Sequence, residues 1–370
     1  MAYKVPFVDY PQHYHNMESE IDAAIKEVLS KGDLILREHL RQFEKNIASY
    51  LGMTHAIGVN SGTDALYLSL LAAGIGPGDE VITVSHTFLA TVGAIVNCGA
   101  RPILVDVGKD YNMDVNLVEA AITPQTRAII PVHLNGRLCD MERIMAIAEK
   151  HNLIVIEDAA QALGATFDGK KAGSFGLTGC FSFYPAKILG TAGDGGLVTT
   201  NDAQIAKKLR GLRDNGRVDW QSEVIGYGFN SRLDNLHAAI LNVKRKFLPQ
   251  WITRRREIAT LYHKGLSDLD ELELPPPPQT DGHYYDVFQN YVVRTKRRDE
   301  LVSHLRENGI EILISWPIPM HHQSALSLGH FKLPETEAIS REVLSLPMYP
   351  ELSDDKVEFV VESIRSFYRR

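Results

Sequence analysis

Cysteine, long apolar runs and excess positive charge are all scarce in this chain of 370 residues. The only cysteines, Cys98, Cys139 and Cys180, lack the pairing of a disulfide framework and the spacing of a zinc site. No apolar run approaches the ~20 residues of a membrane span, and the first residues lack the apolar core of a signal peptide. The net charge of −7 argues against a nucleic-acid surface. We therefore predict a cytoplasmic protein with no membrane or nucleic-acid partner.

Short apolar strand patterns alternate with helical patterns along most of the chain. With 44% hydrophobic and 23% charged residues, the chain can bury a large core. The alternation predicts an α/β fold with a mostly parallel central sheet covered on both faces. The expected strands are Glu80–Val84, Pro102–Val107, Ala128–Val132, Leu153–Ile156, Cys180–Phe183 and Leu197–Thr199.

Composition further divides the chain into two expected domains, with a boundary near Lys246. Residues 1–246, including the N-terminal segment, should form the larger domain, and residues 247–370 a smaller α+β domain. Basic, helical sequence from Leu236 to Gly265 crosses the boundary, and four prolines, Pro275–Pro278, read as a stiff surface connection.

Lys187 stands just past an apolar, aromatic strand pattern that Pro185 ends, and a glycine-rich run, Gly193–Gly196, follows it. This position should direct its amine from a strand end into a crevice. Partial desolvation lowers the pKa of a lysine, which then can attack a carbonyl and form a Schiff base. Most lysines beside glycine turns are solvated surface groups, however, so this motif needs support from others.

Asp158 follows four apolar residues that read as a buried parallel strand, at the carboxyl end where open α/β sheets bind ligands. One interpretation is a helix N-cap ahead of Ala159. The other is a carboxylate that faces the protonated ring nitrogen of pyridoxal phosphate. The strand pattern alone does not separate the two.

A third motif, Asn60–Asp64, leads into the helical stretch Leu66–Ala73. Small polar residues at a helix start offer hydroxyls and free N–H groups, and the helix dipole adds positive potential, so a phosphate could bind there. The same residues could serve as an ordinary cap. A phosphate cradle, a strand-end acid and a strand-end lysine, in that order, together describe a cofactor site.

These motifs resemble the DegT/DnrJ/EryC1/StrS family, the sugar-nucleotide aminotransferases, which are pyridoxal-phosphate enzymes of fold type I. The resemblance covers almost the whole chain and includes Pro6–Tyr10, Gly76–Ile82, Pro131–Leu134, Glu157–Gln161 and Ser345–Pro350. It implies pyridoxal 5′-phosphate as cofactor and L-glutamate as amino donor. The acceptor would be a 3-keto or 4-keto deoxysugar carried on a nucleotide, and the opening and closing segments favour the 3-keto type.

The resemblance also implies roles for residues around the cofactor ring. Lys187 would form the Schiff base and later carry a proton, and Asp158 would pair with the pyridinium nitrogen. Gln161 would meet the ring hydroxyl. Phe88 would lie against the ring face, although most aromatics in such a run are core residues.

At the phosphate, the resemblance assigns Gly62, Thr63 and Ser182 from one chain. Asn230 would reach the same phosphate from the partner subunit, which implies a homodimer with shared active sites. The alternative for Asn230 is a turn residue beside Gly228.

The substrate side is less clearly marked. His321 takes the place of a family histidine near the sugar, whereas a lone histidine is often a hydrogen-bonded structural group. Tyr184 could donate to a sugar oxygen or pyrophosphate, and Arg232 lies on the loop expected to reach the nucleotide's pyrophosphate. No metal is expected, because no further ligands accompany the pair His321–His322 in the sequence.

Three positions depart from the usual family pattern: Arg37 and Asn135 replace a common glycine and tyrosine, and Ile188 replaces a frequent asparagine. These departures leave the sugar open. Two alternatives to an aminotransferase remain, a sugar dehydratase of the same family and a non-catalytic regulator that binds the sugar nucleotide or cofactor. Dehydratases commonly have histidine in place of the Schiff-base lysine, so Lys187 argues against the first, and Lys187 with Asp158 argues against the second.

Overall fold

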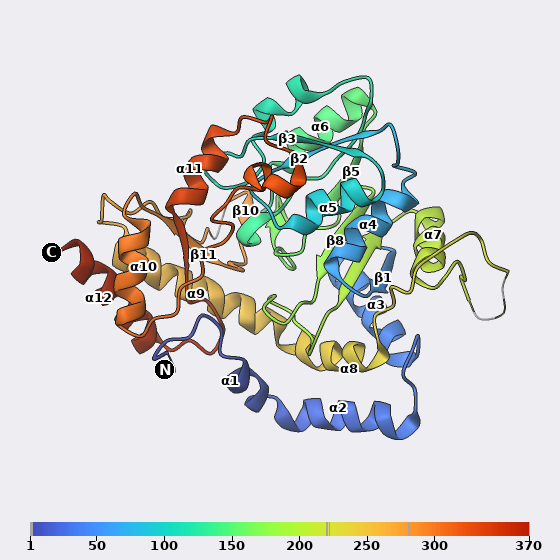
Figure 1. Ribbon diagram of the computed structural model, residues 1–370. Coiled ribbons are helices and arrows are strands. Elements are labelled where there is room, and N and C mark those ends of the chain that lie inside the picture. Colours follow the sequence, from blue (N-terminus) through green and yellow to red (C-terminus); the bar gives the residue numbers. More distant parts are fainter. Residues whose placement is uncertain (1–2, 220, 222, 280–281, 370) are drawn as a thin grey trace.

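A seven-stranded sheet forms the centre of the computed structural model, which describes residues 3–219, 221, 223–279 and 282–369 (Figure 1). The strand order is β1-β9-β8-β5-β4-β2-β3. Pairing is parallel from β3 through β8 and antiparallel on both sides of β9. The predicted α/β fold with a mostly parallel central sheet is therefore confirmed. The strands are β1 His55–Val59, β2 Glu80–Val84, β3 Arg101–Val105, β4 Thr126–Ile129, β5 Ile154–Asp158, β8 Thr178–Ser182 and β9 Gly196–Thr200.

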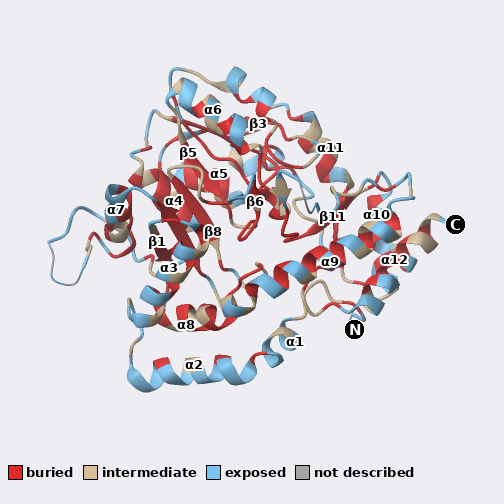
Figure 2. Ribbon diagram, turned by 180° about the vertical axis from the view of Figure 1, so that it is seen from behind, coloured by how far each residue is buried: buried red, intermediate tan, exposed pale blue. Residues whose placement is uncertain are grey.

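The two faces of the sheet are covered by different helices, and neighbouring strand residues alternate between them. In β2, Val81 packs into a cluster with α4, α5 and α7, whereas Ile82 packs into a cluster with α3, α6 and α8. Figure 2 shows the central strands and α4 as almost entirely buried. These helices are α3 Glu38–Leu51, α4 Gly62–Ala72, α5 Leu89–Asn97, α6 Met141–His151, α7 Ala203–Arg213 and α8 Asn235–Lys244.

The strand at one edge, β1, was not predicted. It is short and contains Gly58, which usually weakens a strand. A Cβ on Gly58 would lie 2.7 Å from Cδ1 of Leu40 in α3, so the glycine permits close helix packing. The glycine that interrupts the strand pattern in the sequence is thus explained by the packing of α3 against β1.

The predicted helical stretch from Leu236 to Gly265 is broken in the structure. Helix α8 ends at Lys244, a 3-10 turn covers Arg245–Phe247, and α9 spans Leu248–Leu266. Pro249 lies in the first turn of α9, where its missing N–H is tolerated and where it favours a new helix start. Helix α9 begins in the core of the sheet region with Trp251 and ends in a second core with Tyr262.

The second core lies in the C-terminal part of the chain, around β11 (Tyr291–Arg294) and β12 (Val343–Leu346), which pair antiparallel. Val5, near the N-terminus, joins this core and bridges to Ile310. The division at residue 246 stays a prediction. The elements not yet located are α1 Tyr10–His15, α2 Glu18–Lys31, β6 Thr166–Phe167, β7 Lys170–Lys171, β10 Tyr284–Tyr285, α10 Arg298–Glu307, α11 Pro334–Glu342 and α12 Asp354–Tyr368. Among the described residues, no helix is long and apolar enough to cross a membrane.

An irregular segment from residue 314 to 333 returns from the C-terminal core to the sheet. A small apolar cluster joins it to α5 and β3: Val92, Leu104, Met320, Leu328 and Leu333. Helix α11 follows, and its first turn is anchored because N–H groups of Glu335 and Thr336 donate to the Asp106 carboxylate beyond β3, at 2.8 and 2.9 Å. This packing brings His321 next to Ser85, directly after β2.

Candidate active site

Lys187 lies in the loop after β8, and its backbone is held on both sides. The side-chain amide of buried Gln289 accepts from the Ile188 N–H at 2.9 Å and donates to the Ala186 carbonyl at 2.8 Å. Burial lowers the pKa of the Lys187 amine to about 8, against the opposing attraction of Asp158. The structure thus holds this amine in a desolvated place, as the sequence predicted for a reactive lysine. Gln289 was not recognised from the sequence, because it lies 102 positions further along the chain.

Asp158 is the last residue of β5, and its carboxylate is buried. The Thr91 hydroxyl donates to Oδ2 at 2.8 Å, and the Ala160 N–H approaches Oδ1 at 3.2 Å. Burial raises the pKa of this carboxyl, while the bonds from Thr91 and Ala160 and the charge of Lys187 lower it. Because Asp158 and Lys187 each shift the pKa of the other, the acid and the amine share one site.

Glu157, the neighbour of Asp158 on β5, fixes the strand end from the other side. Its carboxylate accepts three backbone N–H groups of the 173–176 turn at 2.6 to 2.8 Å and contacts Nε2 of buried His133 at 3.0 Å. The Cys139 N–H donates to Nδ1 of His133, so the proton of the neutral ring is on Nε2 and points at Glu157. The backbone N–H of His133 donates to the Asp158 backbone carbonyl at 3.0 Å. This network holds the backbone of Asp158 in place.

Gln161 is oriented by a residue that departs from the family pattern. The Asn135 N–H donates to Oε1 of Gln161 at 2.8 Å, which leaves the amide NH₂ as the free end of that side chain. Asn135 has a φ of 57°, a left-handed conformation that asparagine tolerates better than most residues. Asparagine at this position therefore suits the left-handed backbone whose N–H orients Gln161.

The residues predicted for the phosphate come together at the start of α4. Ser61 caps the helix by accepting the Asp64 N–H. The N–H groups of Gly62 and Thr63 lack helical partners because both residues lie in the first turn. A Cβ on Gly62 would lie 2.8 Å from Cβ of Ser182, at the end of β8. Glycine is thus required for the close approach of α4 to Ser182, and the three predicted residues form one polar corner.

Two aromatic side chains beside this site are unusually exposed. Phe88, directly before α5, is 62% exposed, and Tyr184, three residues before Lys187, is 53% exposed. Burial raises the pKa of Tyr10 in α1, and the electrostatic influence of Tyr184 raises it further. The two tyrosines therefore interact. An apolar ring that lay over the site would remove Phe88 from water.

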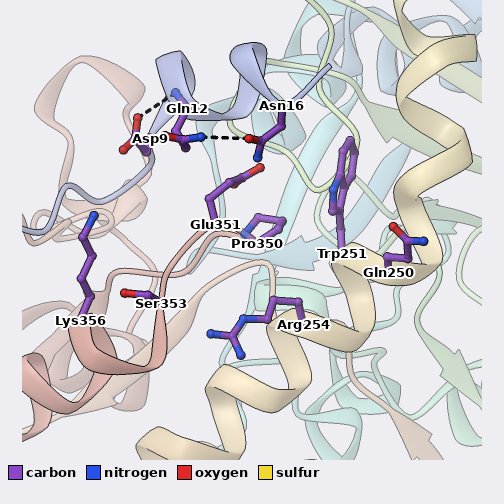
Figure 3. Close-up of a pocket in the computed structure, with 10 residues that line it drawn as sticks. All are labelled: Asp9, Gln12, Asn16, Gln250, Trp251, Arg254, Pro350, Glu351, Ser353 and Lys356. Atoms are coloured by element: carbon purple, nitrogen blue, oxygen red, sulfur yellow. Dashed lines mark hydrogen bonds between the residues drawn. The ribbon is translucent and has the colours of Figure 1, made fainter. Parts of the chain in front are cut away.

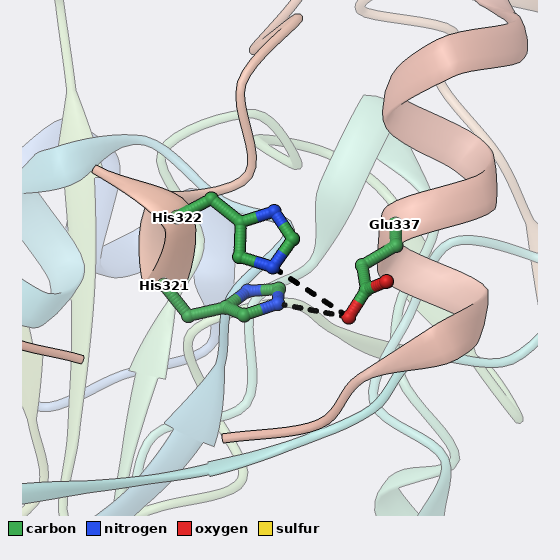
Figure 4. Close-up of side chains that lie close together, drawn as sticks. All are labelled: His321, His322 and Glu337. Carbon is green, nitrogen blue, oxygen red and sulfur yellow. Dashed lines mark hydrogen bonds and ion pairs between the residues drawn. The ribbon is translucent and has the colours of Figure 1, made fainter. Parts of the chain in front are cut away.

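His321 lies in a short 3-10 turn and is almost fully buried. Its Nδ1 is 2.7 Å from Oγ of Ser85, and its Nε2 is 3.4 Å from Oε1 of Glu337 (Figure 4). Burial lowers the pKa of His321, and the bond to Glu337 opposes the shift. The segment that carries Ser85 also carries Phe88 and Thr91, so it connects His321 with the Asp158 end of the site. Glu337 was missed because the sequence separates it from His321 by 16 positions.

Asn230 and Arg232 lie on the loop that leaves the body of the molecule after α7 (Figure 1). Nη2 of Arg232 donates to Oδ1 of Asn230 at 2.6 Å, and Nη1 donates to Asp214 at 2.8 Å. Both side chains therefore contact groups of their own chain in this structure. Arg213, the last residue of α7, is buried and bonded to Glu44 and to the Gly58 carbonyl.

A separate polar groove of about 510 Å³ lies between α1, α9 and residues 350–353 (Figure 3). None of the residues predicted for the site lines it. Two of its charged groups are engaged with neighbours, since Glu351 contacts His13 at 2.7 Å and Arg254 contacts Asp354 at 2.6 Å. The Lys187 cluster therefore remains the candidate active site.

Comparison with known proteins shows the family to which the chain belongs. Residues 15–365 match the model of the DegT/DnrJ/EryC1/StrS aminotransferase family. The chain belongs to the DegT/DnrJ/EryC1/StrS family. It is 44% identical to the UDP-N-acetyl-3-dehydro-alpha-D-glucosamine 3-aminotransferase of Acidithiobacillus ferrooxidans over 98% of this chain and 97% of that protein. It is also 44% identical to a protein of Geobacillus stearothermophilus named pleiotropic regulatory protein, over 99% of both.

A solved structure of this family superposes over the full length of both chains. DesV of S. venezuelae, in complex with a ketimine intermediate, has a TM-score of 0.95 and 42% identity. Fold type I and aminotransferase activity are therefore confirmed, and several relatives are named as aminotransferases of nucleotide sugars. The predicted cofactor, pyridoxal 5′-phosphate, is confirmed as the cofactor of the family's aminotransferases.

The residues present fit this cofactor. A protonated ring nitrogen would offset the cost of burying the Asp158 carboxylate, an exposed Phe88 would be covered by the ring, and the corner of Gly62 and Ser182 would hold the phosphate. The individual contacts of Lys187 and of these residues with the cofactor stay predictions.

Proposed function

We propose that the protein moves an amino group from L-glutamate to the 3-keto group of a nucleotide-linked deoxysugar, and that it works as a homodimer. The observation that carries this proposal is the placement of the desolvated Lys187 amine, on the loop after β8, near the buried Asp158 carboxylate at the end of the neighbouring strand β5. Burial of both groups is costly for a structural role alone. The pairing suits a cofactor that needs a nucleophilic amine and a fixed negative charge.

Bound pyridoxal phosphate supplies an electron sink for a carbanion. Asp158 would hold a proton on the ring nitrogen by its charge, Thr91 keeps that carboxylate in place, and the Glu157–His133 network keeps its backbone in place. With a pKa of about 8, roughly one-tenth of the Lys187 amine is unprotonated at pH 7, compared with about one part in three thousand for an ordinary lysine. Lys187 can therefore attack a carbonyl and, once released, accept and return the proton of the donor's Cα.

The acceptor is assigned from the relatives and from the substrate side of the cluster. One relative at 44% identity is named for a 3-dehydro sugar nucleotide, which favours a 3-keto acceptor over a 4-keto one. The exposed Tyr184 hydroxyl and the buried His321 offer polar groups for sugar oxygens. Arg232 would face the pyrophosphate.

The homodimer is supported by the loop that follows α7. Four apolar side chains on this loop are exposed: Val224, Ile225, Tyr227 and Phe229. Tyr227 is fully exposed to solvent. Such a group on a projecting loop is typical of a protein interface. A partner in this place would bring Asn230 and Arg232 to the other subunit's cofactor.

The test is a two-stage assay of the cofactor-loaded enzyme. L-glutamate alone should convert the yellow cofactor to its amine form and release 2-oxoglutarate, and the resulting protein should aminate a 3-keto sugar nucleotide, detected by mass. Lys187→Ala is the control for uncatalysed exchange. Amination of only 4-keto substrates would contradict the 3-keto assignment, and failure with glutamate but success with glutamine would contradict the donor.

A second candidate is a regulator, because a relative of equal identity carries that name. A regulator would bind pyridoxal phosphate or a nucleotide sugar without turnover. The glutamate stage separates the two, since a regulator releases no 2-oxoglutarate even when its cofactor is fully bound.

A further inference from the structure

We propose that His321, His322 and Glu337 form a binding site for a divalent transition-metal ion of the Zn²⁺ class. The site would have three protein ligands and one open position. No metal was expected from the sequence, because the histidine pair stands there without a neighbouring third ligand. The fold adds the third ligand by placing α11 beside the 3-10 turn of Met320–His322 (Figure 4).

The three ligand atoms are already spaced for a small ion. Oε1 of Glu337 lies 3.4 Å from Nε2 of His321 and 3.7 Å from Nε2 of His322, and all three atoms lie within 4.8 Å of one another. A tetrahedral zinc ion with bonds of about 2.0–2.2 Å separates its ligand atoms by roughly 3.3 Å. Small side-chain rotations therefore complete the geometry, and two imidazoles with one carboxylate are a ligand set that zinc enzymes use.

The shell around these ligands has the form that metal sites require. A metal-binding histidine normally donates its second ring N–H to a fixed acceptor. Oγ of buried Ser85 lies 2.7 Å from Nδ1 of His321, so it can accept that hydrogen and leave Nε2 free for the metal. Glu337 is equally fixed, because the Asp106 carboxylate holds the first turn of α11.

The open position faces solvent space. A cavity of about 300 Å³ adjoins the two histidines, and its lining is His321, His322, Gln323, Ser324, Ser327, Leu328 and Gly329. The His322 side chain is about half exposed, which gives a metal ion a path of entry. Three protein ligands, two of them beside a cavity, match the open type of zinc site.

A simpler reading is that Glu337 only hydrogen-bonds His321. That reading does not explain His322, whose Nε2 points to the same carboxylate oxygen at a distance too long for a hydrogen bond. The neighbouring rings of His321 and His322, with centroids 4.3 Å apart and planes tilted by 52°, bring both Nε2 atoms toward Glu337 (Figure 4). A metal ion accounts for the convergence of all three groups.

The test is a calorimetric titration of Zn²⁺ into untagged, cofactor-loaded protein that has been treated with a chelator. We expect one saturable site per chain, and a visible spectrum of tetrahedral type with Co²⁺. His322→Gln and Glu337→Gln should weaken Zn²⁺ binding at least about tenfold, and Ser85→Ala about 10- to 100-fold through the orientation of His321. His330→Gln, an exposed histidine in the same segment, is the matched control and should bind as the parent does.

Absence of Zn²⁺ binding, or binding that survives both His322→Gln and Glu337→Gln, would overturn the proposal. Binding that is lost in cofactor-free protein but unaffected by those two substitutions would place the ion on the cofactor and would also overturn it. Unchanged thermal unfolding of the metal-free variants shows that the fold is intact. Because the titration needs no turnover, its result is independent of the proposed sugar acceptor.

Discussion

The two ends of the candidate site are built in different ways. The cofactor end, with Asp158 and Lys187, rests on the ends of neighbouring parallel strands β5 and β8, which are 20 residues apart in the chain at their closest. The substrate end, with Ser85, His321 and Glu337, is assembled from three distant segments, held by the small apolar cluster around Met320. A site on regular elements follows from local sequence, whereas a site assembled by an irregular segment depends on tertiary packing.

This difference predicts different functional roles for the two ends. Changes at the cofactor end should stop both halves of the reaction, because the amino donor and the sugar use the same lysine and acid. Changes at the substrate end should affect only the half that uses the sugar. The following predictions test that separation, beginning with the largest effect.

Replacement of Lys187 by Ala should reduce both half-reactions by at least about 10³-fold, because the variant loses the nucleophile and the proton carrier together. The cofactor should still bind, but borohydride should no longer attach it covalently. The measurements are turnover and the mass of the borohydride-treated protein. Lys244→Met is the matched control, since burial also lowers the pKa of Lys244 to about 8. Covalent labelling of Lys187→Ala at another lysine would contradict the assignment.

Asp158→Asn should weaken cofactor binding roughly 10- to 100-fold, the loss expected for a charge-assisted contact worth about 1.5–3 kcal/mol. Both half-reactions should slow further, because the ring nitrogen is no longer held in its protonated form. Cofactor affinity is measured by fluorescence titration, and turnover is measured at saturating cofactor. Asp202→Asn, which removes an exposed capping carboxylate of α7, is the control. Normal turnover of Asp158→Asn would show that Asp158 is only a helix cap.

The sequence could predict the site residues that lie at or just after a strand, but not the residues that reach the site from distant parts of the chain. Asp158 and Lys187 were predicted because one ends a strand and the other closely follows one, and the apolar pattern of each strand is local. Gln289, which clamps the backbone around Lys187, and Glu337, which contacts His321, could not be recognised, since each acts across more than 15 positions and carries no local motif. Strand β1 was missed for the same reason, because Gly58 is explained only by its contact with α3.

His321→Gln should raise the KM for the keto-sugar about tenfold, because it disturbs the contacts with Ser85 and Glu337 that shape the predicted substrate end. The glutamate half-reaction should keep its rate, since the substitution leaves Lys187 and Asp158 untouched. Single-turnover assays of each half supply the comparison, with His330→Gln as control. Equal slowing of both halves would mean that the two ends act as one unit.

Mixing Lys187→Ala with Asn230→Ala should restore about a quarter of the parental activity when subunits exchange freely. Random pairing makes half of the dimers mixed, and each mixed dimer regains one of its two sites. The measurement is turnover after exchange, with mass spectrometry of the intact dimers to show that mixing occurred. If the Asn230 loop serves only its own chain, the mixture stays as inactive as its parents, provided that Asn230→Ala alone is strongly impaired.

The smallest expected effect concerns the stability of the cofactor-free protein and has the opposite sign from the effect on activity. Burial raises the pKa of Asp158 above its unfolded value of about 3.9, so folded protein binds the proton more tightly than unfolded protein does. Stability therefore falls as the pH rises from the unfolded pKa through the folded one, and the full cost is present above both. Asparagine carries no charge and avoids this cost, so the melting temperature of Asp158→Asn should gain on that of the parent from pH 4 to pH 7.

Only the trend with pH tests this prediction, because asparagine has one acceptor oxygen in place of the two that meet Thr91 and Ala160. Loss of one contact lowers stability by a similar amount at every pH, whereas the charge effect grows as Asp158 ionises. Each kcal/mol changes the melting temperature by roughly 1–2 °C in a chain of 370 residues, so calorimetry at several pH values can resolve the slope. Saturating cofactor should reverse the trend, because the ring cation then pairs with the carboxylate. A difference that stays constant from pH 4 to pH 7 would show that Asp158 carries no buried charge in the cofactor-free protein.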